Sequence, residues 1–328
     1  MYTQEPLLRL METGKVFGET EKLKRHIETV ISNVFIFPKH AYKVYKNDNA
    51  FFNNNFRDIS ERKTRFDFTR RDFEWNYKLN SSIYVALKPM AVINGELCVV
   101  DAEMADENVI VMNTFPEESV FINIFKHGVL ENFDAYRGGQ SFAELRGKLP
   151  KLSGNHLDSL AVSLELCNDI YKWTLVQKNK FEIGEVEIFD NLLKKLVTKD
   201  QSVREYFHNH LSASMDIHMG NALYYEGKLM LIDTFSPKES WFIKHECCDL
   251  YRLGTDIRVF MGGEAWELFK SGYYSISLEK PCPPAMDIFS TIYASLIMVS
   301  YLFNLGGEHI EQAKKHQSFL RNYIKSLK

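Results

Sequence analysis

Hydrophobic positions in the first third of the chain fall in short runs that are typical of strands. The runs are rich in β-branched and aromatic side chains, and turn residues such as Pro38-Lys39 and Asn94-Gly95 separate them. We predict strands over residues 27–31, 33–37, 41–45, 83–87, 91–93, 97–100 and 109–112. This part of the chain is therefore expected to form a small sheet.

Residues 57–79 interrupt the strand pattern. Ile59, Phe66 and Phe73 recur seven positions apart among many charged residues, which places them on one face of a helix. We predict that this helix lies with that face against the sheet.

After Pro116 the spacing of apolar residues becomes mostly helical. The predicted helices cover residues 118–133, 155–178, 187–197, 264–274, 287–305 and 309–327. We predict an α+β chain of two lobes, a strand-rich lobe over 1–115 and a larger helical lobe over 116–328. A ligand cleft is expected between them.

One apolar segment, residues 289–305, has the composition of a membrane span. It is at the short end for spanning a bilayer, and it contains serines and a threonine. We interpret it as a core helix and expect no membrane association.

Charge and cysteine content narrow the class of protein. Forty Lys and Arg against 43 Asp and Glu give a net charge near −3, so no basic field indicates a nucleic-acid partner. The five cysteines are an odd number at scattered spacings, which suits a reducing compartment. Since the N-terminal residues lack the pattern of a signal peptide, we expect a cytoplasmic protein.

The strongest chemical signal lies in residues 214–233. Two short apolar strands joined by Gly227 predict a hairpin, so that Asn221 before the first strand lies near Asp233 after the second. The loop before the hairpin would bring Asp216 to the same end. Two carboxylates and a carboxamide are then expected around one small volume.

These groups suit phosphoryl transfer. Asn221 and Asp233 offer the hard oxygen ligands that Mg²⁺ accepts together with substrate phosphates, and Asp216 remains as the base. Phosphoryl transfer requires alignment of a hydroxyl, acceptance of its proton and neutralisation of phosphate charge. The D-x-x-x-x-N spacing followed by a hairpin and an Asp also follows the logic of protein-kinase catalytic and metal loops.

On these residues the chain resembles the aminoglycoside-phosphotransferase-like kinases, within them a group of predicted bacterial kinases. The family segment H-G-D-x-H-x-x-N matches Asp216, His218 and Asn221, with Ser214-Met215 replacing His-Gly, and the second Asp matches Asp233. The resemblance implies a two-lobed protein-kinase-like fold that binds ATP and Mg²⁺. It implies that Asp216 is the base, that His218 structures the loop and that Asn221 and Asp233 bind the metal.

The resemblance continues in the first lobe through residues 27–32, 41–43 and 76–84. It makes Lys43 the phosphate lysine, held by an acid on the following helix. The family pattern places Asp72 there, and Glu74 is the alternative. Residues 29–32, with the hydroxyls of Thr29 and Ser32, would cover the phosphates although they include no glycine.

Two further roles follow from the resemblance. The connection whose backbone meets adenine would be formed by Val109, Ile110, Val111 and Met112. Asp249 matches a position that braces the catalytic loop. No G-x-x-x-x-G-K-[ST] segment is present, so we expect the kinase-like module without a P-loop partner domain.

The chain is therefore predicted to transfer the γ-phosphoryl group of ATP to a hydroxyl of an unidentified, small-molecule acceptor. Three alternatives remain open. The first is a non-catalytic nucleotide-binding protein, and the second is an enzyme of the same fold that modifies a protein. The third is a zinc or iron site at His208 and His210, with Asp216 and His218 nearby. Asp134 and Arg137 either border the acceptor pocket or belong to a polar loop.

Overall fold

The computed structural model describes residues 3–29, 31–127, 133–150 and 158–327. The chain forms two compact units. Unit 1 consists of Met1–Pro116 with Leu231–Lys238, and unit 2 consists of Glu117–Met230 with Glu239–Lys328. An antiparallel sheet dominates unit 1 and helices dominate unit 2, which confirms the predicted α+β class.

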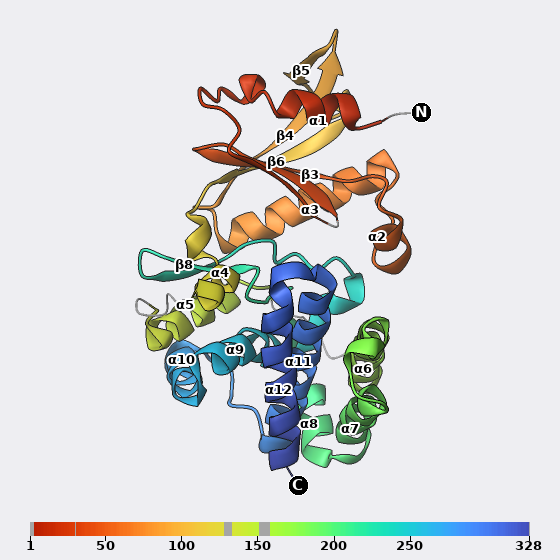
Figure 1. Cartoon of the computed structure of the whole chain (residues 1–328), viewed down its shortest axis with the longest axis vertical. Coiled ribbons are helices and arrows are strands. Elements are labelled where there is room, and N and C mark those ends of the chain that lie inside the picture. Colours follow the sequence, from red (N-terminus) through yellow and green to blue (C-terminus); the bar gives the residue numbers. More distant parts are fainter. Residues whose placement is uncertain (1–2, 30, 128–132, 151–157, 328) are drawn as a thin grey trace. The chain divides into compact units, whose positions relative to one another are not determined.

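The sheet of unit 1 has the order β1-β2-β3-β6-β4-β5, and every neighbouring pair is antiparallel (Figure 1). The strands are β1 (Arg25–Glu28), β2 (Ser32–Ile36), β3 (His40–Tyr45), β4 (Tyr84–Ile93), β5 (Glu96–Val99) and β6 (Glu107–Asn113). Asn94 and Gly95 join β4 to β5 with φ angles of 52° and 81°, as a two-residue hairpin turn requires. The hairpin and the other predicted strands are confirmed, although 83–87 and 91–93 belong to one strand, whereas the predicted strand 27–31 is observed only as far as Glu28.

Alternation along β3 divides its side chains between the two faces of the sheet. Tyr42 and Val44 join the apolar core that contains Leu7 and Met11 of α1 (Glu5–Met11). Lys43 points to the opposite face, toward α3 (Arg62–Leu79). The first loop of this unit also contains η1 (Lys15–Phe17), and α2 (Ala50–Asn55) precedes α3.

The buried face of α3 differs from the predicted one. Phe66 and Phe73 are only half-buried, and Ile59 precedes the helix. The buried residues are Arg65, Phe68, Thr69, Asp72, Asn76 and Leu79. A spacing rule that counts only apolar residues misses this face, because the face contains polar side chains that have buried partners. Arg65, for example, forms a buried ion pair with Glu107.

The segment Leu231–Lys238 belongs to unit 1, whereas the sequence division at residue 115 assigned it to the second lobe. Phe235 explains part of this placement, because its ring packs against Phe68 and Trp75 of α3. In addition, side chains of α3, of its C-cap residue Asn80 and of β4 bind the backbone of the segment.

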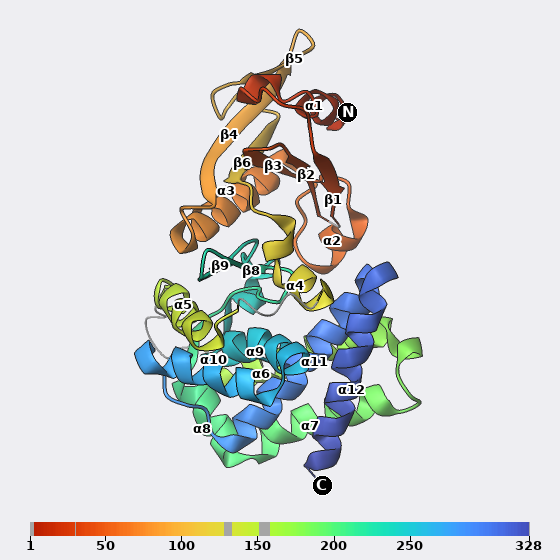
Figure 2. The same ribbon diagram turned by 60° about the vertical axis from the view of Figure 1, so that its left-hand side comes forward.

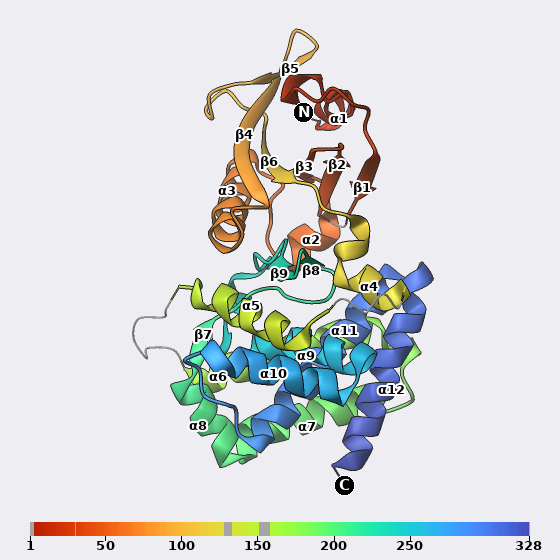
Figure 3. The same ribbon diagram turned by 90° about the vertical axis from the view of Figure 1, so that its left-hand side faces the viewer.

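Unit 2 is built from helices that surround α11 (Pro284–Leu305), which packs against α6, α7, α8, α9 and α12. Its other helices are α4 (Phe121–His127), α5 (Ala135–Gly147), α6 (Ser159–Val176), α7 (Glu185–Lys199), α8 (Gln201–Asn209), α9 (Cys248–Met261), α10 (Gly263–Ile276) and α12 (Ile310–Ser326). Figures 2 and 3 show α5 alongside α10. Single turns η2 (Glu117–Ser119), η3 (Lys178–Lys180), η4 (Glu239–Phe242) and η5 (Gly307–His309) complete the helical part.

Two short strand pairs complete the unit. Strands β7 (Leu211–Ala213) and β10 (Ile243–His245) are antiparallel, and β8 (Ala222–Tyr225) pairs with β9 (Lys228–Leu231). Glu226 and Gly227 connect β8 to β9 with φ angles of 50° and 76°. The predicted hairpin is confirmed.

Helices α5, α8 and α9 are absent from the sequence prediction. Asp134 is the N-cap of α5 and accepts a hydrogen bond from the backbone N–H of Arg137, so the polar-loop interpretation of these two residues is wrong. The predicted helices 118–133 and 155–178 partly fall on 128–132 and 155–157, which lie outside the described residues.

Helix α11 is the one helix among the described residues that is long and apolar enough to cross a membrane. Of its most apolar 18-residue window, 67% is buried within the protein. The predicted core helix is confirmed.

Candidate functional site

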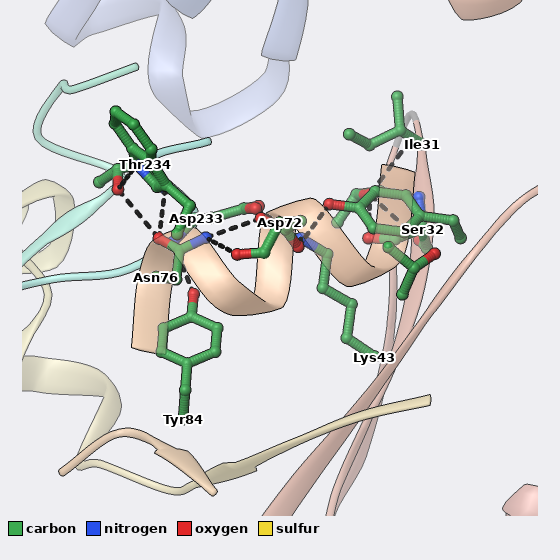
Figure 4. Close-up of polar contacts among 12 residues, drawn as sticks. Ile31, Ser32, Lys43, Asp72, Asn76, Tyr84, Asp233 and Thr234 are labelled. Carbon is green, nitrogen blue, oxygen red and sulfur yellow. Dashed lines mark hydrogen bonds and ion pairs between the residues drawn. The ribbon is translucent and has the colours of Figure 1, made fainter. Parts of the chain in front are cut away.

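Lys43 connects two carboxylates in unit 1. Its Nζ atom lies 3.4 Å from Oδ2 of Asp72 and also forms an ion pair with Asp233 (Figure 4). The side chains of Lys43 and Asp72 are 4% and 0% exposed, whereas that of Asp233 is 45% exposed. The cluster therefore has a buried acid on one side of the ammonium and an accessible acid on the other.

Neighbouring polar groups fix the buried acid. Tyr45 donates a hydrogen bond of 2.8 Å from its hydroxyl to Asp72 Oδ2, and Asn76 donates one of 2.7 Å to Asp72 Oδ1. The Lys43 ammonium also lies 4.5 Å from the centre of the Tyr45 ring. Tyr45 has no role in the site predicted from the sequence, although its position two residues after Lys43 puts both side chains on one face of β3.

Burial and charge oppose each other in this cluster. Burial raises the pKa of Asp72 to about 6, although the Lys43 ammonium acts in the opposite direction. Burial alone would lower the pKa of Lys43, but the carboxylates of Asp233 and Asp72 outweigh it and raise the pKa above its ordinary value. Lys43 is therefore a permanent cation at neutral pH.

Glu74 does not take part in this cluster. Its side chain is 58% exposed and pairs with Arg70 at 3.1 Å. Two residues along a helix correspond to about 200° of rotation, so an acid at 74 faces away when Asp72 faces the sheet. Of the two acids considered from the sequence, the structure brings only Asp72 to Lys43.

The turn between β1 and β2 uses its own backbone donors. The hydroxyl of Thr29 accepts hydrogen bonds from the N–H groups of Ile31 and Ser32, at 3.2 and 2.9 Å. It also lies 2.9 Å from the Ser32 hydroxyl. In this conformation the Thr29 hydroxyl occupies these two N–H groups, and the prediction that the turn covers the phosphates stays a prediction.

Residues Val109, Ile110, Val111 and Met112 do not form a connection. They lie within β6, which pairs with β3 on one side and β4 on the other. A strand with neighbours on both sides uses its backbone groups in the sheet, so these residues are not the predicted connection, and the prediction that they bind adenine stays a prediction. The run was misassigned because the spacing rules do not distinguish a central strand from a connection that follows it.

In unit 2, Asp216 and Asn221 lie on the loop between β7 and β8. Asp216 Oδ1 accepts a hydrogen bond of 3.1 Å from Arg252 of α9, and Asn221 donates one of 2.9 Å to the Asp216 carbonyl. Burial acts to raise the pKa of Asp216, but the charge of Arg252, with His218 and Lys244, brings it below its ordinary value. Asp216 is therefore an ionised acceptor at neutral pH. Arg252 was not identified from the sequence as a site residue.

Asp249 contacts the start of the same loop. Its carboxylate accepts hydrogen bonds from the Ser214 hydroxyl at 2.6 Å and from the Met215 N–H at 3.0 Å, and it pairs with Arg146 of α5. Arg146 also pairs with Glu279 at 2.7 Å. Ser214, which departs from the family pattern, thus donates directly to the residue predicted to brace the loop.

The centre of the loop turns around His218. Nδ1 of His218 accepts a hydrogen bond of 3.0 Å from the N–H of Gly220, and the imidazole packs against Tyr301 with 4.3 Å between ring centres. A Cβ atom at Gly220 would lie 2.9 Å from the imidazole. The local packing therefore favours glycine at this position.

Asp216 and Asn221 belong to unit 2 and Asp233 to unit 1. The prediction that the three residues surround one volume stays a prediction.

The described residues contain no group of three or more His, Cys, Asp or Glu side chains that could hold a metal ion. His210 pairs instead with Glu246 at 3.1 Å. The prediction that Asn221 and Asp233 bind Mg²⁺ stays a prediction.

Solved structures of three small-molecule kinases are similar to this chain. A choline/ethanolamine kinase family protein from Mesorhizobium loti is 13% identical, with a TM-score of 0.49, and the match covers 98% of this chain and 99% of that one. Choline kinase LicA from Streptococcus pneumoniae is 12% identical, with a TM-score of 0.48 and coverage of 95% and 99%. An aminoglycoside phosphotransferase from Streptomyces rimosus is 13% identical, with a TM-score of 0.46 and coverage of 90% and 98%.

No protein-family model and no curated protein matches the sequence. At these identities and TM-scores the similar structures do not assign a function.

Proposed function

We propose that this protein is an ATP-dependent phosphotransferase that transfers the γ-phosphoryl group to a hydroxyl of a small molecule. The observation that carries the proposal is the Lys43 ammonium, buried beside Asp72 and paired with the accessible Asp233. A buried cation with one exposed partner is suited to bind an anionic ligand and its metal ion.

Within unit 1, Lys43 would bind the phosphates, with Asp72 holding its ammonium in place. Asp233 would supply one metal ligand, and Asn221 of unit 2 would supply another through its amide oxygen. When bound, Mg²⁺ neutralises charge on the phosphates. A carboxylate and a carboxamide fit this ion, whereas they offer none of the nitrogen or sulfur ligands that zinc favours.

Within unit 2, Asp216 would orient the acceptor hydroxyl and accept its proton. The ion pair with Arg252 fixes one carboxylate oxygen and keeps the group ionised. Asp249 and His218 would hold the loop that presents Asp216, through the hydrogen bonds to Ser214, Met215 and Gly220.

The proposed acceptor is a small molecule, because the sequence resembles kinases of that class. The proposed compartment is the cytoplasm.

The direct test is binding and hydrolysis of Mg-ATP by the purified protein. We expect Asp233→Ala to lose Mg²⁺-dependent nucleotide binding, and Asp216→Ala to retain binding while losing slow turnover. Asp101→Ala, at an exposed position, is the matched control. If the wild type bound no nucleotide with any divalent metal ion, the proposal would be wrong.

A second candidate is a nucleotide-binding protein without phosphotransferase activity. The Thr29–Ser32 turn favours it, because Thr29 occupies backbone donors that a phosphate would otherwise use. This candidate predicts Mg-ATP binding with no transfer to any acceptor. Incubation with labelled ATP, with metabolite mixtures and with lysate proteins, would distinguish it from both a small-molecule and a protein kinase.

A further inference from the structure

The backbone at Asp233 has an uncommon conformation. Its φ angle is 53°, in the left-handed region that residues other than glycine seldom adopt. Aspartate tolerates this region better than most residues, but the conformation persists only where surrounding contacts hold it. The relevant contacts all lie within unit 1.

Three side chains spaced four residues apart bind the backbone around Asp233. Asn80 donates a hydrogen bond of 2.8 Å to the carbonyl of Leu231. Tyr84 accepts one of 2.8 Å from the N–H of Asp233, and Asn76 accepts one of 3.0 Å from the N–H of Thr234. Figure 4 shows Tyr84 and Asn76 in these contacts. We call Asn76, Asn80 and Tyr84 the backbone clamp.

The clamp residues are buried, with exposed fractions of 1% for Asn76, 7% for Asn80 and 1% for Tyr84. Asn76 and Asn80 are one helical turn apart at the end of α3, and Tyr84 begins β4. The segment 76–84 was already singled out in the sequence as a match to predicted kinases, without a role for its side chains. Its first and last residues are both part of the clamp.

Asn76 also connects the clamp to the charged cluster. Its amide nitrogen donates to Asp72 Oδ1 at 2.7 Å, while its amide oxygen accepts from Thr234. One side chain thus binds the acid that holds Lys43 and the backbone that presents Asp233. An asparagine can do both because it carries a donor and an acceptor on one rigid group.

We propose that Asn76, Asn80 and Tyr84 are positioning residues that hold the left-handed backbone of Asp233 and so direct its carboxylate toward Lys43 and the metal ion. This inference rests on the proposed function for the metal, whereas the clamp itself does not require a nucleotide. Tyr84→Phe is the most informative variant, because it removes one acceptor and preserves the buried ring. Tyr77→Phe, at a 47% exposed position of α3, is the matched control.

The first measurement is hydrogen exchange in the peptide that contains residues 231–234, in the absence of nucleotide. We expect Tyr84→Phe to speed exchange of the Asp233 amide by about tenfold, the effect of losing one hydrogen bond, and Tyr77→Phe to leave it unchanged. Thermal unfolding confirms that each variant is folded. Unchanged exchange in Tyr84→Phe would overturn the clamp, whatever the protein binds.

The second measurement is the Mg²⁺ dependence of ATP binding. Tyr84→Phe should raise the Mg²⁺ concentration for half-maximal binding by about tenfold, since the metal ligand is less well oriented. In an Asp233→Asn background, Tyr84→Phe should cause no further rise in this Mg²⁺ concentration, because the clamp acts through Asp233. Additive effects would indicate a general structural role and overturn the positioning role. If the wild type bound no nucleotide, the proposed function and this positioning role would both fail, and the exchange data would still decide the clamp.

Discussion

Nζ of Lys43 lies 3.4 Å from Oδ2 of Asp72, and both side chains are almost completely excluded from water. A buried ion pair contributes little net stability, but removal of one partner leaves the other charge buried and unpaired. The pair therefore places a strong constraint on substitution at either position.

Lys43→Met tests this constraint. The variant leaves Asp72 buried near Asp233 with no cation between them, and we expect it to lower the free energy of unfolding by about 3–5 kcal/mol at pH 7. Urea denaturation measures the change. Lys39→Met, on an exposed turn, is the control, expected to stay within about 0.5 kcal/mol of the wild type. Equal stability of the two variants would contradict the buried pair.

The pKa of Asp72 predicts a pH dependence with a defined sign. Its folded-state pKa of about 6 lies above its ordinary value of 3.8, so the folded state binds more protons between these two pH values. Ionisation of this group therefore removes stability as the pH rises from about 4 to above 6. In Asp72→Asn, position 72 has no ionisable side chain, so this loss of stability with rising pH is absent.

The measurement is the difference in unfolding free energy between Asp72→Asn and the wild type from pH 4 to pH 7. The other ionisable groups are present in both proteins, so their effects on stability largely cancel in this difference. We expect the difference to move in favour of the variant by up to about 3 kcal/mol as the pH rises. A difference that does not vary with pH would show that the pKa of Asp72 is not raised.

Local sequence patterns were sufficient to predict the strands, both hairpins and the core helix, because alternation, paired turn residues and long apolar runs are short-range signals. Lys43 and Asp72 were paired through a family resemblance, and the structure brings them together. The buried face of α3 could not be predicted in this way. Arg65 and Asn76 are polar, and their burial depends on partners at Glu107 and Thr234, far away in the sequence.

Other errors have the same origin. Met112 was assigned to a connection because the apolar run 109–112 carries no information about which strands flank it. Arg146 was missed because its partners, Asp249 and Glu279, follow it by more than a hundred residues. Residues whose roles depend on long-range partners are poorly predicted from one sequence.

Arg146 offers a test of the predicted role of Asp249 as a brace of the loop that carries Asp216. Its side chain is 4% exposed and pairs with the fully buried Asp249, so Arg146→Met should cost about 3–5 kcal/mol of unfolding free energy. Arg137→Met is a matched control on the same helix, with a side chain that is 75% exposed, and should cost less than about 1 kcal/mol. Under the proposed function, Arg146→Met also slows turnover more than it weakens nucleotide binding. A cost equal to that of Arg137→Met would contradict the brace.

Gly220 tests the geometry of the loop centre. An added Cβ would lie 2.9 Å from Cε1 and 3.0 Å from Nδ1 of His218, and 3.2 Å from the Tyr301 hydroxyl. Since the loop must shift to accommodate the methyl group, we expect Gly220→Ala to lower the unfolding free energy by about 1–3 kcal/mol. The His218 ring would also lose its alignment with the Gly220 N–H.

Gly147→Ala is the control for Gly220→Ala, because nothing lies within 4 Å of its added Cβ. Gly147 ends α5, so alanine there should stabilise the protein by up to about 1 kcal/mol through helix propensity. Chemical denaturation measures the change in unfolding free energy of each variant relative to the wild type. The two changes have opposite signs if the loop is packed as described. If Gly220→Ala were as stabilising as Gly147→Ala, the segment 218–220 would tolerate a side chain, and His218 would then have no fixed role in presenting Asp216.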